Sequence, residues 1–359
     1  MKGDMDDPEK PRENSNITTQ RERFQGDEEM TENIERIMAV LVIAILCFAA
    51  TANQANAAGH LEIVLYTNSQ YYMLGSNVAI YGYLFNDSNR VGDGIINLQV
   101  DYPNGTWQAV FRTLSTGTMP AQPPAFQILC LYPCNQSGGP KNSFRRGEFA
   151  YFNVTFRNNN STKIDYYTTL TCFDSTNSVM DSNYFSGSLN AYTVDSWLIP
   201  FSINEKASIG RAIVYANIFD KLPKNGGTAL ALEASATFNV TGTTGLMTPP
   251  SQGLTQQAQT PGTFMTNFTI PKFQYQGNYT IYTTSRYKGL FTSAQKWIMM
   301  RTADVNLDNR VNVLDLIIVA SNIGKTGPPG WISSDLNRDG KVNVLDLIIV
   351  ATWIGWVSP

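Results

Sequence analysis

Residues 61–100 read LEIVLYTNSQYYMLGSNVAIYGYLFNDSNRVGDGIINLQV, and this stretch decides the fold class. Apolar residues recur at alternate positions in short runs, and Asn-Ser, Leu-Gly-Ser, Asn-Asp-Ser and Gly-Asp-Gly separate the runs. Alternation with period two is typical of a strand with one buried and one wet face, and the interruptions are turn sequences. The stretch therefore predicts the antiparallel strands of a β-sandwich.

The same pattern continues to about residue 300 in two further stretches. Residues 124–241 carry enough strand-like runs for one β-sandwich of about a hundred residues. Residues 245–263, rich in Pro, Gln, Gly and Thr, predict a flexible linker or long loop, and 264–300 is a shorter β unit. The first module, 60–118, is short for a complete sandwich. We therefore expect 262–300 to complete it, with 124–241 inserted between the halves; two small independent sheets are the alternative.

Charge and histidine content exclude several classes of function. The 359 residues carry a net charge of -3, so no basic excess indicates a nucleic-acid partner. The single histidine, His60, is a poor basis for a Ser-His-Asp triad or a two-histidine metal site. Paired Asp and Glu residues, as in glycoside hydrolases, are the remaining catalytic route, but the candidates lie in no local motif, and we expect no enzyme. These candidates are Asp195, Glu205, Asp220 and Glu233.

The N-terminal region predicts export. Residues 1–36 are acidic and too hydrophilic to bury a core, so we expect a disordered prefix. An uncharged apolar run begins at Ile37, and the small residues after it suit a signal peptidase. Residues 37–58 therefore predict a signal peptide or, if uncleaved, a membrane anchor. Either Met30 is the true start, or the prefix is a cytoplasmic tail.

A doubled motif near the C-terminus carries the most specific chemistry. The decapeptide Val311–Ala320 is identical to Val342–Ala351, and a ladder of oxygen-bearing side chains at alternate positions precedes each copy. Such a ladder in a tight loop points its oxygens toward one hard cation, and calcium takes six to eight oxygen ligands. We therefore predict two calcium ions. The ligands at loop positions one, three, five, seven (a backbone carbonyl), nine and twelve are Asp304, Asn306, Asp308, Arg310, Asn312 and Asp315 in the first loop, and Asp335, Asn337, Asp339, Lys341, Asn343 and Asp346 in the second.

The two loops differ at the sixth position, which needs a sharp turn. The second loop has Gly340 there, and the first has Asn309, the residue next best suited to a left-handed backbone. We therefore expect the first site to be the weaker of the two. The following segments, Val313–Ile323 and Val344–Ile354, predict helices that bury Leu, Ile and Val against each other. The whole is a small, paired EF-hand-like unit.

Paired loop-helix units joined by a short linker resemble a type I dockerin, and the resemblance covers 303–356. It implies two calcium-binding loops whose helices face a cohesin-like or other surface protein. Loop positions ten and eleven, which face the cohesin in that family, are Val313 and Leu314 in one copy and Val344 and Leu345 in the other. They are apolar here, unlike the hydroxyl-bearing pair common in cellulosomal dockerins.

Three runs of the β region, Tyr72–Gly82, Pro103–Thr106 and Phe144–Asn158, are similar to segments of macroglobulin-like and immunoglobulin-like modules of archaeal cell-surface proteins. Such modules occur in adhesins, sheath proteins and secreted enzymes. The resemblance therefore implies an architecture and an extracellular or cell-surface location more than an activity.

Three cysteines follow the apolar segment. In an exported chain a disulfide is a commoner use of cysteine than a metal site. We expect Cys172 to pair with either Cys130 or Cys134.

Polar and aromatic residues of the β modules suggest sugar chemistry. Nine Asn-Xaa-Ser/Thr sequons in these modules fit a glycosylated surface, although composition alone also produces them. Aromatic residues such as Tyr71, Tyr72, Trp107 and Trp197 would form a carbohydrate platform, but core packing is their commoner use. The sequons are at Asn86, Asn104, Asn135, Asn153, Asn159, Asn160, Asn239, Asn267 and Asn278.

Together these features predict an exported, non-catalytic structural and interaction protein that docks through a calcium-dependent dockerin-like domain. The alternative is a carbohydrate-binding or polysaccharide-degrading component of a secreted, cellulosome-like assembly. The identity of the docking partner and the oligomeric state do not follow from the sequence.

Overall fold

The structure is a computed structural model, and everything below concerns the part of the chain that it describes. The chain divides into two units, Met1–Gly59 and His60–Pro359, and nearly all described residues belong to the second. The acidic prefix, the apolar segment 37–58 and most of the linker 245–263 lie outside the described residues. Among the helices that are described, none has both the length and the apolar character needed to cross a membrane. The described ranges are 59–117, 125–242 and 260–358.

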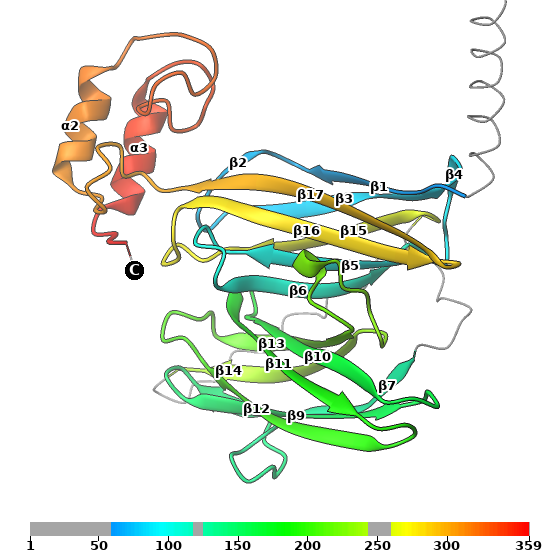
Figure 1. The fold of residues 1–359 in the computed structure, drawn as a ribbon. Coiled ribbons are helices and arrows are strands. Elements are labelled where there is room, and N and C mark those ends of the chain that lie inside the picture. Colours follow the sequence, from blue (N-terminus) through cyan, green and yellow to red (C-terminus); the bar gives the residue numbers. More distant parts are fainter. Residues whose placement is uncertain (1–58, 118–124, 243–259, 359) are drawn as a thin grey trace, which may run out of the picture. The chain divides into compact units, whose positions relative to one another are not determined.

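The described residues are mainly strands, with two α-helices near the C-terminus, which confirms the predicted fold class (Figure 1). The first sandwich takes strands from both sides of 124–241. One sheet has the order β1 (Leu61–Thr67), β3 (Asn77–Asn86), β15 (Thr263–Thr269), with β4 (Asn89–Arg90) paired to β3. The other has the order β2 (Tyr71–Met73), β17 (Leu290–Arg301), β16 (Gly277–Tyr287), β5 (Ile95–Asp101), β6 (Gln108–Ser115).

Strand β3 shows how the sequence pattern produces this sandwich. Its Val78, Ile80 and Leu84 are fully buried, whereas Tyr81 between them is exposed, as period-two alternation requires. Strand β3 pairs antiparallel with β1 on one side and with β15 on the other. Residues before and after 124–241 thus share both sheets, and we propose on this basis that 124–241 is an insertion between two halves of one sandwich.

The second sandwich contains the strands between these halves. Its core includes the rings of Phe126, Phe152, Phe156 and Tyr166, all of which are buried. One sheet has the order β11 (Val179–Leu189), β10 (Ile164–Phe173), β13 (Gly210–Phe219), β14 (Ala234–Thr241), β8 (Ser143–Arg145). The other has the order β12 (Val194–Ser202), β9 (Phe149–Asn158), β7 (Phe126–Cys134), and a short 3-10 helix, η2 (Pro223–Asn225), lies between β13 and β14.

The predicted disulfide is wrong for the described residues, where all three cysteines are free. Cys172 is on β10 and Cys134 is on β7, in different sheets, and both are buried as small apolar residues. Cys130 is exposed. Burial raises the pKa of the Cys172 thiol well above its ordinary value, which keeps the thiol protonated and unreactive.

A buried ion pair joins the two sandwiches. The Arg112 guanidinium on β6 lies 2.8 Å from Glu233, and both side chains are 12% exposed. The Glu233 carboxylate accepts from Nε and Nη2 of Arg112 and from the Thr113 backbone N–H, and the guanidinium stacks 3.6 Å from the Tyr215 ring centroid. Because both charges are paired and hydrogen-bonded, their burial is tolerated.

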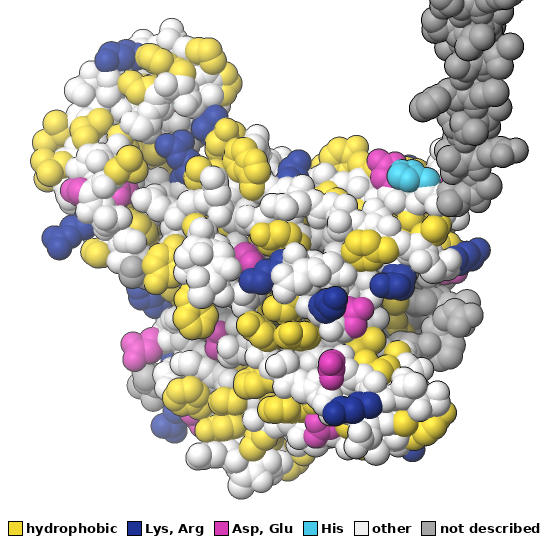
Figure 2. All heavy atoms as spheres, in the orientation of Figure 1, with side chains coloured by type: hydrophobic (Ala, Val, Ile, Leu, Met, Phe, Trp, Pro, Cys, Tyr) yellow, Lys and Arg dark blue, Asp and Glu magenta, His cyan; other side chains and the backbone are white. Residues whose placement is uncertain are grey.

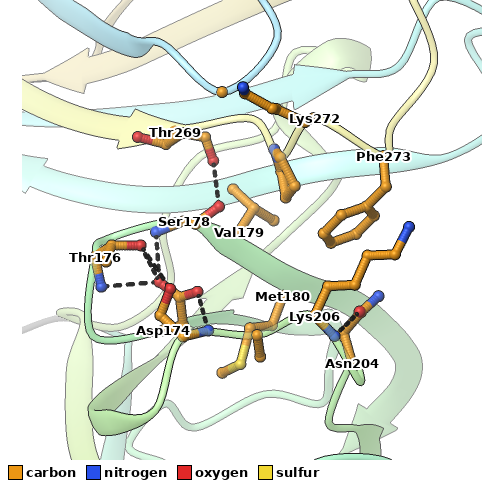
Figure 3. Close-up of a pocket in the computed structure, with 14 residues that line it drawn as sticks. Asp174, Thr176, Ser178, Val179, Met180, Asn204, Lys206, Thr269, Lys272 and Phe273 are labelled. Carbon is orange, nitrogen blue, oxygen red and sulfur yellow. Dashed lines mark hydrogen bonds between the residues drawn. The ribbon is translucent and has the colours of Figure 1, made fainter. Parts of the chain in front are cut away.

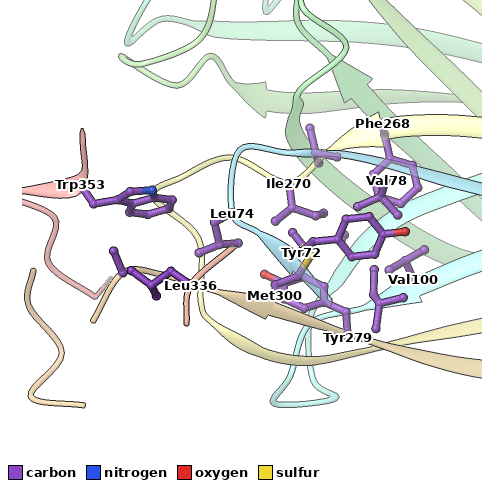
Figure 4. Packing of buried hydrophobic residues seen from close by; sticks show 14 of the residues in the cluster. Tyr72, Leu74, Val78, Val100, Phe268, Ile270, Tyr279, Met300, Leu336 and Trp353 are labelled. Carbon is purple, nitrogen blue, oxygen red and sulfur yellow. The ribbon is translucent and has the colours of Figure 1, made fainter. Parts of the chain in front are cut away.

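The C-terminal unit follows the first sandwich directly. Strand β17 ends at Arg301, and Thr302 and Ala303 are buried, so the first predicted ligand, Asp304, comes three residues after the strand. The two helices are α2 (Val313–Ser321) and α3 (Val344–Trp353). One hydrophobic cluster runs from the first sandwich into this unit, and Figure 4 shows Leu74 of the sandwich near Leu336 and Trp353.

Candidate calcium loops and docking face

The twelfth-position aspartate closes each loop onto the start of its helix. Asp315 accepts the Val305 N–H at 2.8 Å on Oδ1 and the Asn312 N–H at 2.9 Å on Oδ2. Asn312 in turn accepts the Leu314 N–H at 2.7 Å, which makes a capping box at the N-terminus of α2. The second copy repeats these contacts with Asp346 and Asn343. Identical sequence has therefore produced identical local structure.

The ladder side chains bend the loop around their own oxygens. The Asp308 N–H donates to Asn306 Oδ1 at 3.0 Å, and the Arg310 N–H donates to Asp308 Oδ1 at 2.9 Å. The corresponding distances in the second loop are 3.0 and 2.8 Å. Asn and Asp commonly make such turns to their own backbone two residues on. The turns hold the third and fifth positions of each loop in fixed orientations.

The first-position aspartates differ between the loops. Asp304 uses both carboxylate oxygens, since Oδ1 accepts the Asp308 N–H at 3.1 Å and Oδ2 accepts the Asn309 N–H at 2.8 Å. Asp335 receives both of its hydrogen bonds on Oδ2, from Gly330 and Gly340. Its Oδ1 is buried and accepts no hydrogen bond from the described residues. A buried carboxylate oxygen left without a partner is costly, and a bound cation would satisfy it.

Asp304 also indicates crowding of negative charge. Burial raises its pKa above the ordinary value, and the Asp315 and Asp308 carboxylates raise it further, against the backbone N–H groups of Asn309 and Asp308 that lower it. A dication would replace the lost hydration and offset the repulsion. Within the described ranges no three His, Cys, Asp or Glu side chains form a metal cluster on their own. The donor sets instead mix carboxylates, Asn side chains and backbone carbonyls, the oxygen chemistry that calcium accepts.

Both loops make the left-handed turn at position six. Asn309 has φ 67° and Gly340 has φ 82°. A Cβ atom at Gly340 would lie 2.5 Å from the Gly327 carbonyl oxygen, so only glycine fits there. The first loop therefore reaches the turn with Asn, and the second has an additional steric reason for Gly.

Each loop pairs with the segment that follows the other helix. Arg310 forms an antiparallel bridge with Val357, and Lys341 forms one with Thr326. The Val311 N–H donates to the Trp356 carbonyl at 2.9 Å, and the Val342 N–H donates to that of Lys325 at 3.0 Å. This reciprocal pairing joins the two copies into one body. It also leaves the side chains of the seventh-position residues exposed while their backbones are held in place.

The expectation that the helices bury their apolar residues holds for only part of each helix, where four further residues pack against the hydrophobic cluster: Leu316, Ile318, Leu347 and Ile349. Val319 and Val350 are fully buried, but three apolar residues on each helix are more than half exposed. The reason is that each short helix has only a narrow stripe against its neighbour. The exposed set is Val313 (60%), Leu314 (52%) and Ile317 (57%) on α2, and Val344 (62%), Leu345 (52%) and Ile348 (52%) on α3. We call these six residues the docking face.

Sequence reasoning missed Ile317 and Ile348. Both lie three residues after Leu314 or Leu345, a spacing that places side chains on one helix face. The helical period was therefore the signal that could have found them. Figure 2 shows apolar side chains gathered at the surface over α2, where a soluble helix ordinarily carries polar ones.

Aromatic and cationic contacts hold the C-terminal unit on the first sandwich. The Trp356 indole Nε1 donates to the Lys272 carbonyl at 2.6 Å, and Lys272 Nζ lies 4.9 Å from the Trp353 ring centroid. The Arg338 guanidinium lies 3.7 Å from the Tyr71 ring centroid. None of these residues belongs to the docking face.

The candidate catalytic acids do not assemble. Asp195 accepts the Tyr166 hydroxyl at 2.7 Å, and Glu233 pairs with Arg112. Asp220 accepts backbone N–H groups of its own loop, and Glu205 is exposed. Each acid thus has a local structural partner or lies in solvent.

The pocket in Figure 3 has a volume of about 380 Å³ and lies between strand ends of the two sandwiches. Among the described residues that line it, the only carboxylate is Asp174, which is already engaged: Oδ1 accepts the Thr176 and Ser178 N–H groups, and Oδ2 accepts the Ser208 N–H. These bonds fix the loop after β10. The pocket supplies no unengaged carboxylate for acid-base chemistry.

The aromatic residues predicted as a sugar platform lie apart. Tyr72 is buried, and the Trp197 indole donates to Tyr166 inside the second sandwich. Trp107 is exposed in the β5–β6 turn, and Tyr71 stacks edge-on against Trp297. A different aromatic row lies on the outer face of the first sandwich, where ring contacts of 5.7, 6.3 and 5.9 Å connect Tyr81, Tyr66, Tyr83 and Phe85 in that order.

Comparison with known proteins supports the C-terminal assignment. Residues 302–354 match the type I dockerin domain family, whose members bind calcium, and no curated protein matches the chain. The match confirms the dockerin resemblance and the calcium prediction in general terms. The macroglobulin and archaeal resemblances stay predictions.

Solved structures show only distant likenesses. A DNA glycosylase from Pseudomonas fluorescens has a TM-score of 0.25 and 16% identity, covering 33% of this chain and 30% of its own. A β-glucosidase from Erythrobacter marinus has a TM-score of 0.26 and 10% identity, covering 33% of this chain and 16% of its own. A CARDB domain from Pyrococcus furiosus, solved with two metal ions, has a TM-score of 0.23 and 12% identity, covering 33% of this chain and 93% of its own. The chain spans less than a third of the first two structures, and likenesses at this level carry no argument about function. The family to which part of this chain is similar is therefore the type I dockerin, over residues 302–354.

Proposed function

We propose that this protein is an extracellular docking protein, in which two β-sandwiches carry a calcium-dependent module that binds a cohesin-type partner. The match to type I dockerins, a family of cohesin-binding domains, supports the partner class. A non-catalytic role fits the candidate acids, each of which is engaged in structure or exposed alone.

The observation that carries the proposal is the docking face. Six apolar side chains on two calcium-loop helices are more than half exposed, and the exposed fractions of equivalent residues differ by at most five percentage points. Exposed apolar patches on soluble proteins mark interaction sites. Positions ten and eleven of each loop, where the family binds its partner, belong to this face.

Calcium would act on the face through the loops. We propose one ion in each loop, bound by the twelve predicted ligand residues. Each loop ends in the capping box of its helix, so ion binding would fix the helix that carries positions ten and eleven. The ion's binding energy would then contribute to folding of the unit.

A pull-down tests the proposal. The full chain is immobilised and incubated with a cell-surface extract of the organism that produces it. It should capture a partner in the presence of calcium and release that partner in EGTA. The double variant Leu314→Asp, Leu345→Asp should lose capture by more than about tenfold, because a charge in each half of the apolar face opposes burial. Met265→Asp is the matched control, since Met265 is 51% exposed on β15. Capture that persists in EGTA, or with the double variant, contradicts the proposal.

A second candidate function, carbohydrate binding, is favoured by the row Tyr66, Tyr81, Tyr83 and Phe85. Tyr66 is 43% and Tyr81 is 37% exposed, on the outer face of a sheet that would ordinarily be polar. Flat rings with hydroxyl groups combine stacking with hydrogen bonding. Affinity electrophoresis in gels that contain soluble polysaccharides should retard the wild type. The double variant Tyr81→Ala, Tyr83→Ala should not be retarded. Equal mobility of both proteins in every gel contradicts this candidate.

A further inference from the structure

The nine sequons of the β modules are not equivalent in the structure. Asn86 and Asn153 are half-buried in strands, Asn239, Asn267 and Asn278 are exposed on strands, and Asn159 and Asn160 are exposed directly after β9. Only at Asn104 and Asn135 does an exposed turn also bring the hydroxyl-bearing residue at position +2 onto the sequon asparagine.

Asn135 sits in the tight turn after β7. Its Oδ1 accepts the Ser137 hydroxyl at 2.8 Å, the Ser137 N–H at 3.0 Å and the Gly139 N–H at 2.9 Å. Its Nδ2 donates no hydrogen bond within the described residues. The carbonyl half of the amide is thus held by the sequon's own serine, and the nitrogen half is unengaged.

Asn104, in the β5–β6 turn, repeats the backbone N–H contacts of this arrangement, while its +2 hydroxyl donates to the backbone instead. Its Oδ1 accepts the Thr106 N–H at 3.0 Å and the Trp107 N–H at 3.3 Å, and the Thr106 hydroxyl donates to the Asn104 backbone carbonyl at 3.4 Å. Its Nδ2 likewise has no partner among the described residues. Asn153 is the informative contrast: Thr155 also donates to its Oδ1, but Asn153 is half-buried on β9, between β7 and β12.

We propose that Asn135 and Asn104 are acceptor sites for N-linked glycans, attached during export from a lipid-linked sugar phosphate donor. The Nδ2 atom forms a bond to C1 of the sugar, the bond from C1 to the donor's phosphate oxygen breaks, and Nδ2 loses one proton. The donor departs as the lipid phosphate. Hydrogen bonds to Oδ1 fix the amide plane, so that Nδ2 is presented to the transferring enzyme.

The test is glycopeptide mass spectrometry on the protein isolated from its own source. Trypsin separates the sites, since Asn104 lies in peptide 91–112, Asn135 in 113–141 and Asn153 in 147–157. The first two peptides should carry sugar on most copies, and the third should be mostly unmodified. Bare Asn104 and Asn135 peptides, or a modified Asn153 peptide beside bare turns, would overturn the proposal.

Variants in the same source test whether sugar on peptide 113–141 is attached at the Asn135 sequon. Ser137→Ala should lower occupancy at Asn135 by at least about tenfold, and Ser137→Thr should retain it, because only the first removes the hydroxyl. Ser143→Ala, outside every sequon, is the control for handling of the chain. Undiminished occupancy of the peptide in Ser137→Ala contradicts attachment at Asn135.

Discussion

The two candidate calcium loops share their predicted ligand types at every position and differ in how the protein holds them. In the first loop both oxygens of Asp304 accept backbone N–H groups, and Asn309 makes the left-handed turn. In the second, Asp335 has one buried oxygen without a hydrogen-bond partner among the described residues, and Gly340 makes the turn where a Cβ atom would meet the Gly327 carbonyl. Nearly identical ligand ladders can thus be differently prepared for the same ion.

This difference teaches that ligand spacing is only part of affinity. An oxygen already bonded to backbone N–H groups gives up part of those bonds to a cation, whereas an orphaned buried oxygen gives up nothing. We therefore infer that the second loop binds calcium more tightly. The sequence reaches the same order from Asn309 alone, on a different physical ground.

Removing calcium should have the largest effect. EGTA should lower hydrogen-exchange protection of the Val311 and Val342 amides by more than about tenfold, because the loops would lose the ions that hold them. Amides of β9 and β10 in the second sandwich are the internal control and should keep their protection. Unchanged protection at both valines would contradict calcium-supported folding of the unit.

Neutralising the first ligand should separate the loops. Asp335→Asn should weaken the tighter calcium site by about a hundredfold, because it removes the charge and, with the amide oxygen held by the Gly330 and Gly340 N–H groups, places an NH2 group where Oδ1 would face the ion. Asp304→Asn is the matched change in the first loop and should affect only the weaker site. Calcium titration followed by calorimetry measures both. If both variants lost the same amount of affinity at the same site, the proposed order of the two calcium affinities would be refuted.

The sixth position should show a smaller, steric effect. Gly340→Ala places a Cβ atom against the Gly327 carbonyl at positive φ, and we expect it to cost about 1–3 kcal/mol of unfolding free energy. Asn309→Ala, which leaves a Cβ atom in place, serves as the comparison and should cost less. Thermal unfolding in saturating calcium is the measurement, and equal shifts would remove the steric argument.

The smallest expected effect is a gain in the free energy of unfolding. Asn309→Gly relieves the left-handed strain of the first loop but adds backbone entropy to the unfolded chain, so its net effect should be below about 1 kcal/mol. The change should bring the two calcium affinities closer together. A wider gap between them would show that the Asn309 side chain itself supports the first site.

Local patterns predicted what depends on local structure. Period-two alternation around Val78 and Leu84 predicted β3, and the duplicated segments after the loops predicted helices from Val313 and Val344, because strand faces and helix starts involve residues close in sequence. Contacts set by distant parts of the chain were harder to predict. The predicted disulfide is absent from the described residues because Cys134 and Cys172 are buried in different sheets. The spacing of residues along the chain does not show which strands share a sheet.

The docking face also depends on contacts between distant parts of the chain, which local patterns did not predict. Leu, Ile and Val on α2 and α3 predicted burial, yet each helix buries only a narrow stripe, since its neighbour is equally short. The orphaned Oδ1 of Asp335 and the aromatic row on β1 and β3 also depend on tertiary contacts. Alternate spacing would have placed Tyr81, Tyr83 and Phe85 on one face of β3, but the contribution of Tyr66 required the pairing of β1 with β3.

Calcium titration of the full chain by isothermal calorimetry tests the central claim most directly. The account predicts two ions per chain with distinct affinities, and about a hundredfold weakening of the tighter one in Asp335→Asn. Absence of calcium binding to the wild type, or an unchanged tighter site in Asp335→Asn, would contradict it.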